Sequence, residues 1–145
     1  MTRREAREAL FTLVYEISFC KENVEGEEAV GVEEIAYKRI EYRDLNDPYI
    51  KEGIEGVLSK LSDIDLLISE NAIGWKLERL SKVSHSIMRL ACYEMVYTDL
   101  PVNIAINEAL ELAKKYDHDQ APAFINGVLN SIADKLGLKD KSENR

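Results

Sequence analysis

The sequence has few of the features that mark a secreted, membrane or metal-binding protein. It has only two cysteines, Cys20 and Cys92, and neither has a partner cysteine or histidine at ligand spacing, so a disulfide framework or metal site is not expected. No apolar run approaches the roughly 20 residues of a membrane span, and the residues after Met1 lack the apolar segment of a signal peptide. We therefore expect a cytoplasmic protein whose cysteines are buried, reduced thiols.

Motifs of catalysis are also missing. The sequence contains no glycine-rich phosphate loop, no HExxH and no GxSxG. Its two histidines, His85 and His118, stand alone at a helix start and in a turn, where they are expected to be surface residues. Asp63 and Asp65 are expected to face water rather than a cleft. The sequence favours a binding protein over an enzyme, with no cofactor, no metal and no small-molecule substrate.

Basic residues are outnumbered, 19 against 27 acidic ones, so the formal charge is −8 and the pI about 4.9. This balance argues against a nonspecific nucleic-acid binder and against an anionic membrane surface, so any anion site must be local. Only three prolines and seven glycines occur in 145 residues, which leaves little room for linkers. We expect one domain, 1–138, with halves of about 1–75 and 76–138 and a polar tail, 139–145.

Apolar residues recur at spacings of three and four along most of the chain, which is typical of amphipathic helices. Helices are predicted from Arg3 to Phe19 and from Val32 to about Arg43. One long helix is predicted from Pro48 through Ile68, with Asn46-Asp47 as its cap, and a short piece is predicted around Leu77 and Leu80. The next helix is predicted from Lys82 to Tyr97 with Ser81 as its N-cap, and because its apolar residues cover more than one face it should be enclosed on two sides. Two more helices are predicted within Pro101 to Leu136. The acidic stretch Lys21 to Glu34 is predicted to connect the first two. An all-α fold follows.

The last two predicted helices form a hairpin with two unusual residues. Pro122 opens the second helix and Gly137 ends it. Within that helix, Gly127 costs roughly 1 kcal/mol relative to alanine, and Asn126 is polar. Close packing or function explains such residues, and we favour packing for Gly127. Trp75 is expected to lie under apolar cover as a structural anchor.

Cationic residues gather at the start of the first helix. Arg4, Arg7, Phe11 and Tyr15 fall on one flank of its buried stripe, with Arg3 at the edge. In so acidic a chain, these arginines form a phosphate-attracting patch with aromatic rings beside it. The alternative is that they pair with neighbouring glutamates on a solvated face.

A second, weaker basic cluster surrounds the start of the Lys82 helix. Its members are Lys76, Arg79, Lys82 and Arg89. They are expected to be ordinary solvated charges unless the fold brings them beside the first-helix arginines.

Several segments share a recognisable pattern when they are taken together in chain order. They are RREAREA (3–9) with LVY (13–15), IGWKLERL (73–80), MRLACYEM (88–95), VNIAINEA (102–109) with LAK (112–114), and FINGVL (124–129). This ordered set resembles the bacterial transcription antitermination factor NusB family. Each alone is mostly amphipathic helix, but the ordered set spans nearly the whole chain and is specific.

The resemblance implies an all-helical protein of about seven helices packed as two small subdomains. It also implies binding to boxA-type RNA with the small-subunit ribosomal protein that serves as NusE, in the elongation complex that transcribes ribosomal RNA. By this resemblance, Arg3, Arg4 and Arg7 contact phosphates with Tyr15 nearby, Phe124 stacks on a base, and Asn126 forms a hydrogen bond.

Some features depart from the family pattern. Many relatives have a longer basic lead than Met1-Thr2, so RNA affinity is expected to depend more on the protein partner. Relatives often have an acid where this chain has Gln120, which should repel phosphate less, so Gln120 is included among the expected RNA-binding residues. Because the chain ends at Arg145, a stand-alone factor is expected rather than a fusion to an RNA cytosine methyltransferase. The competing hypothesis is a helical protein-binding adaptor without RNA-binding activity.

Overall fold

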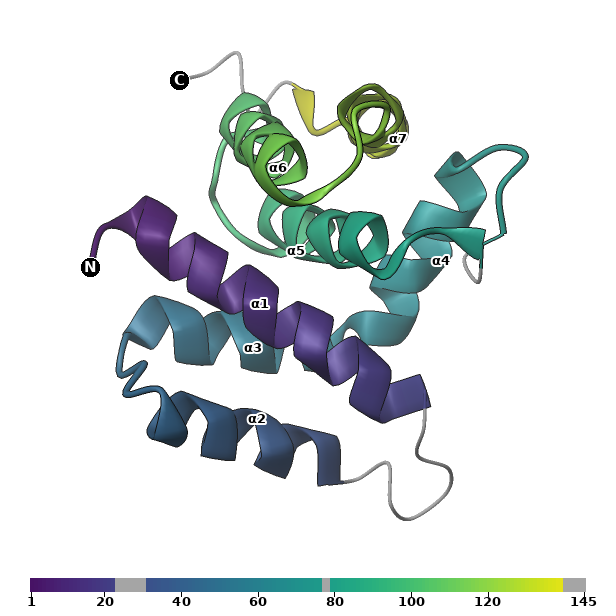
Figure 1. Cartoon of the computed structure of the whole chain (residues 1–145). Coiled ribbons are helices and arrows are strands. Elements are labelled where there is room, and N and C mark those ends of the chain that lie inside the picture. Colours follow the sequence, from purple (N-terminus) through teal and green to yellow (C-terminus); the bar gives the residue numbers. More distant parts are fainter. Residues whose placement is uncertain (23–30, 77–78, 140–145) are drawn as a thin grey trace. The chain divides into compact units, whose positions relative to one another are not determined.

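The computed structural model describes residues 1–22, 31–76 and 79–139. Within these residues the chain forms seven α-helices and no strand, which confirms the predicted all-α class (Figure 1). The helices are α1 (Arg3–Glu22), α2 (Val32–Tyr42), α3 (Pro48–Ser59), α4 (Leu61–Asn71), α5 (Lys82–Tyr97), α6 (Val102–Tyr116) and α7 (Ala121–Lys135). None of them is long and apolar enough to cross a bilayer. Most of the acidic stretch, Leu77 and all but the first residue of the predicted tail lie outside the described residues.

The described contacts group the chain into two compact units, Met1–Ser59 and Lys60–Arg145. This division lies before α4, which belongs to the second unit, and not near residue 75 as the sequence predicts. The long helix predicted from Pro48 is in fact two helices, α3 and α4. Lys60 separates them with φ −110° and ψ 11°, outside the helical region.

In the first unit, α1 packs against both α2 and α3, which also contact each other (Figure 1). The predicted stripe of α1 is buried, and its core residues meet apolar side chains of the other two helices. The buried side chains include Ala6, Leu10, Leu13, Val14, Ile17, Ala36, Ile40, Ile50, Ile54 and Val57. Each large apolar side chain buried here contributes roughly 1.5–3 kcal/mol, so this core fixes the face that α1 turns outward.

The connection between α2 and α3 is fixed by hydrogen bonds at both helix ends. Asp44, with φ +55°, donates its N–H to Glu41 O, and the Leu45 N–H donates to Ile40 O, which together form a Schellman end. Asp47 Oδ1 then accepts a hydrogen bond of 2.8 Å from the Tyr49 N–H, as the predicted cap requires. Tyr49 is thereby held in the first turn of α3.

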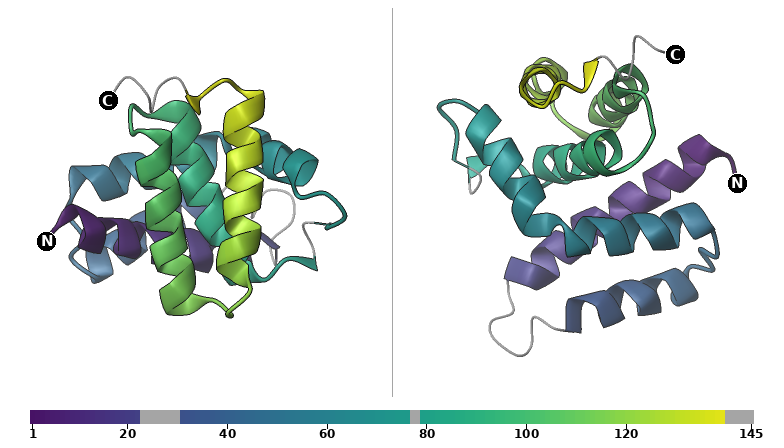
Figure 2. Two further views of the ribbon diagram at one scale, coloured as in Figure 1. Left: turned by 90° about the horizontal axis from the view of Figure 1, so that it is seen from above. Right: turned by 180° about the vertical axis from the view of Figure 1, so that it is seen from behind.

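In the second unit, α5 contacts α4, α6 and α7, which confirms the prediction that it is enclosed on more than one side. Figure 2 shows α6 and α7 running side by side. Cys92 of α5 is fully buried, and burial, with the nearby Asp65 charge, raises the pKa of its thiol to about 12. The side chain of Cys20 lies outside the described residues.

Capping groups fix the ends of α5 and α7. Ser81 Oγ accepts a hydrogen bond of 3.0 Å from the Ser84 N–H, so the predicted N-cap of α5 is confirmed. At the end of α7, Gly137 has φ +68°, and the Leu138 N–H donates to Ala133 O. The helix therefore ends at the predicted glycine in a left-handed turn that favours glycine.

Candidate functional site

The start of α1 carries the first group of candidate binding residues. Thr2 Oγ1 accepts a 3.1 Å hydrogen bond from the Glu5 N–H, and the Glu5 carboxylate accepts one of 3.3 Å from the Thr2 N–H. This reciprocal pair is a capping box, which the sequence analysis missed although Thr-x-x-Glu before an apolar run is its signal. Arg3 and Arg4 are exposed beside it, at the positive end of the helix dipole.

Tyr49 of α3 forms cation–π contacts with two of the α1 arginines. The Arg3 Cζ lies 4.2 Å, and the Arg7 Cζ 5.6 Å, from the centroid of the Tyr49 ring, within the usual range for such contacts. Arg7 is only 5% exposed, so it is not the surface cation that helical periodicity predicts. Tyr49 was not a predicted site residue, since nothing in the sequence shows that α3 brings it under α1.

The aromatic part of the predicted α1 flank is also less exposed than expected. Phe11 is buried, whereas Tyr15 is half-buried, and their ring centroids lie 6.4 Å apart. The exposed charge of this flank therefore comes from Arg3 and Arg4, while Arg7 and Phe11 belong to the packed side of the helix.

An acid on another side of α1 is engaged by arginines of α2. The Glu16 carboxylate forms an ion pair of 3.6 Å with Arg39 and a second ion pair with Arg43. Arg43 also donates a 3.2 Å hydrogen bond to Thr12 Oγ1. The negative charge of Glu16 therefore lies on the side of α1 that packs against α2.

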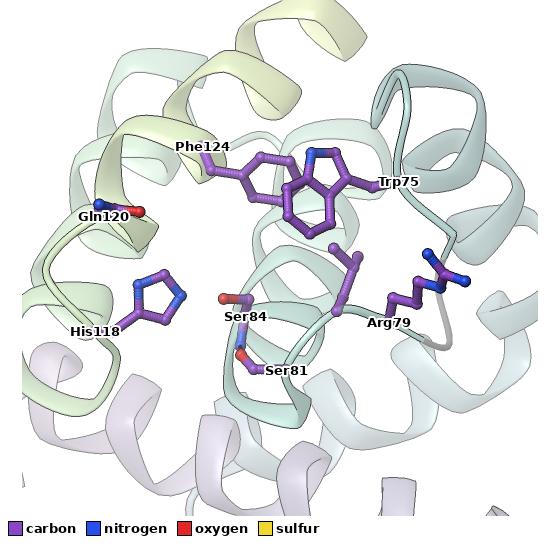
Figure 3. Close-up of a pocket in the computed structure, with 8 residues that line it drawn as sticks. Trp75, Arg79, Ser81, Ser84, His118, Gln120 and Phe124 are labelled. Atoms are coloured by element: carbon purple, nitrogen blue, oxygen red, sulfur yellow. Dashed lines mark hydrogen bonds between the residues drawn. The ribbon is translucent and has the colours of Figure 1, made fainter.

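The second unit contains a cavity of about 350 Å³ beside the turn between α6 and α7 (Figure 3). It is lined by Trp75, Arg79, Leu80, Ser81, Ser84, His118, Gln120 and Phe124. The rings of Trp75 and Phe124 meet edge to face, with centroids 5.7 Å apart and an angle of 62°. Two residues predicted to bind RNA, Gln120 and Phe124, therefore line the same cavity.

Trp75 does not lie under apolar cover, as the sequence analysis expected, because 53% of it is exposed. The turn that follows α4 explains its position. Gly74 has φ +84°, and the Trp75 N–H donates a 3.0 Å hydrogen bond to Ala72 O. This turn holds the backbone at the helix end, and the indole projects past it toward Phe124 (Figure 3).

The polar side of the cavity is organised by a buried acid behind it. The Asp117 carboxylate, 4% exposed, accepts hydrogen bonds from Ser84 Oγ and, at 2.9 Å, from the His118 N–H. The His118 ring is 63% exposed, as predicted for a surface histidine, and lies with Gln120 on one side of the cavity (Figure 3). Asp117 thus lies directly behind two lining residues, Ser84 and His118, and holds their positions through these hydrogen bonds.

Asn126 and Gly127 lie on an exposed face of α7, outside the cavity lining. Asn126 Oδ1 and its backbone oxygen accept hydrogen bonds of 3.0 and 2.9 Å from Asn130 Nδ2. A Cβ added at Gly127 would meet nothing within 4 Å. The predicted close packing around Gly127 is therefore wrong, and its helix-destabilising effect is not offset by a neighbour within the described chain.

Replacing Gly127 by alanine should raise the free energy of unfolding by about 0.5–1 kcal/mol, because alanine favours the helix and the added Cβ meets open space. Urea denaturation followed by circular dichroism measures the change. Gly53→Ala is the matched control and should lower the free energy of unfolding, because its added Cβ would lie 2.3 Å from Leu10 Cδ2 in the core. A destabilised Gly127→Ala chain would contradict this assignment.

The second basic cluster is not a single group. Lys76 and Arg79 are exposed and Lys82 is half-buried, whereas Arg89 is bonded to Asp65 of α4 through two hydrogen bonds of 2.8 and 2.7 Å. Its side chain is only 12% exposed. Arg89 is therefore a structural residue that joins α4 to α5, and not the solvated charge that the sequence analysis expected.

Asp65 also differs from its prediction, because it faces α5 rather than water. The His85 ring nitrogen lies 2.8 Å from its carboxylate, and the His85 side chain is 12% exposed, so this histidine is not a surface residue. Burial alone would raise the pKa of Asp65, but hydrogen bonds from Arg89 and His85 outweigh it and lower the pKa to about 2.

This lowered pKa predicts a specific pH dependence of stability. Because the folded-state pKa lies below the ordinary value of 3.8, ionised Asp65 stabilises the fold above about pH 4, and this contribution is lost as pH falls toward 2. The difference in unfolding free energy between the unmodified chain and Asp65→Asn should be about 2 kcal/mol at pH 6 and shrink toward zero near pH 2. Urea denaturation at several pH values tests this, and a pH-independent difference would contradict it.

The predicted binding residues thus fall into two groups, one in each unit. The first comprises Arg3, Arg4, Arg7 and Tyr15 of α1. The second comprises Gln120 and Phe124, which line the cavity beside Arg79 of the second basic cluster, and Asn126, which lies outside the lining. Among the described residues, no group of three or more His, Cys, Asp or Glu side chains could hold a metal ion.

The sequence and the fold match one known class of protein. The sequence model described as the NusB family matches residues 4–134. Transcription antitermination protein NusB of Bacillus pumilus is 38% identical over 94% of this chain and 98% of its own length. The protein of the same name from Natranaerobius thermophilus is 41% identical over 94% and 97% of the two chains.

Solved structures agree with the sequence comparison. A structure of T. maritima NusB superposes with a TM-score of 0.80 at 33% identity and covers 99% of this chain and 98% of that chain. A chain in the crystal structure of a plectonemic RNA supercoil has the same fold, with a TM-score of 0.75 at 22% identity. The chain belongs to the NusB family of transcription antitermination proteins.

Proposed function

We propose that this chain binds boxA-type RNA together with the small-subunit ribosomal protein that serves as NusE, and that it acts in the elongation complex during ribosomal RNA transcription. The observation that carries the proposal is the capped start of α1, where Arg3 and Arg4 are exposed and Tyr49 holds the Arg3 guanidinium. A chain of net charge −8 repels a polyanion overall, so RNA binding requires a local cationic site of this kind.

The second unit supplies the groups that contact bases in this proposal. Phe124 offers a ring for stacking, and Gln120 offers amide hydrogen-bonding groups at the same cavity. Stacking of unpaired bases on aromatic rings is the common mode of single-strand recognition. Asn126, exposed on the same helix, is assigned a hydrogen bond to the RNA. The RNA is therefore bound as a single strand.

The proposed role is one of binding without a catalytic step. The relatives are named as antitermination proteins. Asp65, the described acid whose pKa is lowered, forms hydrogen bonds with Arg89 and His85 between α4 and α5. These groups stabilise the second unit and are not assigned a substrate.

A gel-shift titration with and without the ribosomal protein tests the proposal. We expect retardation of a short boxA-type RNA by this chain, and retardation at lower protein concentration when the ribosomal protein is added. If the ribosomal protein binds but the RNA is never retarded, the chain is a protein-binding adaptor and the proposal is wrong. A scrambled RNA of equal length controls for nonspecific binding.

A further inference from the structure

We propose, as an extension of the RNA-binding function above, that the cavity lined by Trp75 and Phe124 binds one unstacked base of single-stranded RNA, and that Arg79 contacts an adjacent phosphate. Trp75 is the new residue in this assignment. It would form the second aromatic wall of a base-binding site whose first wall is Phe124.

The exposure of Trp75 is the first observation that points to a ligand. More than half of Trp75 is exposed, although its backbone is fixed in the turn after α4 and its ring touches Phe124. A large aromatic surface that remains exposed beside a cavity is typical of a binding site. The two rings meet edge to face, so the surface of each that is not in this contact is available for stacking on a heterocycle.

The charged side chain in the described cavity lining, Arg79, favours an anionic group on the ligand. Among its described lining residues, Arg79 is the charged one and none is acidic. The nearby acid, Asp117, is buried and accepts hydrogen bonds from Ser84 Oγ and the His118 N–H. Arg79 is exposed at the side of the cavity opposite His118 and Gln120 (Figure 3), where it can reach a phosphate while the base lies against the rings.

The size of the cavity restricts the occupant to a single nucleotide unit. Its volume of about 350 Å³ lies at the small end of the range of ligand sites, roughly 300–1,000 Å³. Bases within a double helix are stacked and paired, so they cannot enter such a site without being extruded. The occupant is therefore a base of a single strand, with serine, glutamine and histidine side chains available for its polar edge.

Trp75 is the only tryptophan of the chain, so its intrinsic fluorescence reports directly on this cavity. The experiment titrates the full chain with a 12-nucleotide single-stranded boxA-type RNA at low salt, and follows tryptophan fluorescence. In a second titration, the protein is added to the same RNA carrying a 5′ dye, and the fluorescence anisotropy of the dye is followed. We expect quenching of Trp75 over the same concentration range as the rise in anisotropy.

Substitutions identify the contribution of each wall. Trp75→Leu and Phe124→Leu should each weaken RNA binding by roughly 5- to 150-fold, the effect of losing one base–aromatic stack, whereas Trp75→Phe should retain most of the affinity. Ile73→Ala is the matched control, because Ile73 is an apolar residue of the same turn, 84% exposed and outside the cavity lining. It should bind RNA as the unmodified chain does.

The possible failures are distinguishable. If the anisotropy rises while Trp75 fluorescence is unchanged and Trp75→Leu binds normally, the base-binding site is wrong but RNA binding stands. If the anisotropy does not rise at any protein concentration, the RNA-binding function is wrong, and the base-binding site with it.

Discussion

Replacing Arg3 and Arg4 together by alanine should weaken binding of single-stranded boxA-type RNA by roughly 10- to 100-fold at low salt. Both side chains are exposed at the capped start of α1, and each is assigned a charge-assisted contact to a phosphate. Two lost contacts should also reduce the slope of log affinity against log salt concentration by about 1.4, since each phosphate contact on a single strand contributes about 0.7. Fluorescence anisotropy at four salt concentrations measures both quantities.

The control for this experiment removes the same net charge elsewhere. Lys38 of α2 and Lys114 of α6 are exposed, and the double variant Lys38→Ala with Lys114→Ala should leave the salt slope unchanged. Equal losses in the two double variants would mean that RNA responds only to overall charge, and the assigned arginine site would be abandoned. Arg7 is not included, because its burial against Tyr49 would mix a loss of stability with a loss of binding.

Arg89→Ala should lower the free energy of unfolding by about 3 kcal/mol. The substitution removes both hydrogen bonds to the Asp65 carboxylate, which is only 24% exposed and would keep His85 as its described partner. For a chain of this length the loss corresponds to a fall in Tm of roughly 6–12 °C. Thermal unfolding followed by circular dichroism at neutral pH gives the value.

An exposed arginine of the same unit serves as the comparison. Arg79→Ala should change the unfolding free energy by less than about 0.5 kcal/mol, although it should weaken RNA binding if Arg79 contacts a phosphate. Equal stability of the Arg89→Ala and unmodified chains would show that the ion pair between α4 and α5 contributes little, and would remove the structural role assigned to it.

Local signals in the sequence were sufficient for most helix boundaries. The Asp47-Pro48 start of α3, the Ser81 cap of α5 and the Gly137 end of α7 are all confirmed, because each depends on a side chain or dihedral angle of the residue itself. The break between α3 and α4 was missed. Apolar residues keep helical spacing across Lys60, with Val57 before it and Leu61 after it, and neither proline nor glycine marks the break.

The residues whose environment was predicted wrongly depend on contacts between distant segments. Arg7 lies on the flank of the α1 stripe, but Tyr49 of α3 covers it. Asp65 and Arg89 are 24 positions apart, so no spacing rule within one helix pairs them. Hydrophobicity alone would bury Trp75, whereas the turn at Gly74 exposes it beside Phe124.

The central claim is that one RNA strand contacts both the arginine-bearing start of α1 and the aromatic cavity of the second unit. Photo-crosslinking of a boxA-type RNA that carries 4-thiouridine, followed by mass spectrometry of the linked peptides, tests it most directly. We expect linked peptides from both regions, with Trp75 or Phe124 among the modified residues. The absence of crosslinks from either region would contradict it.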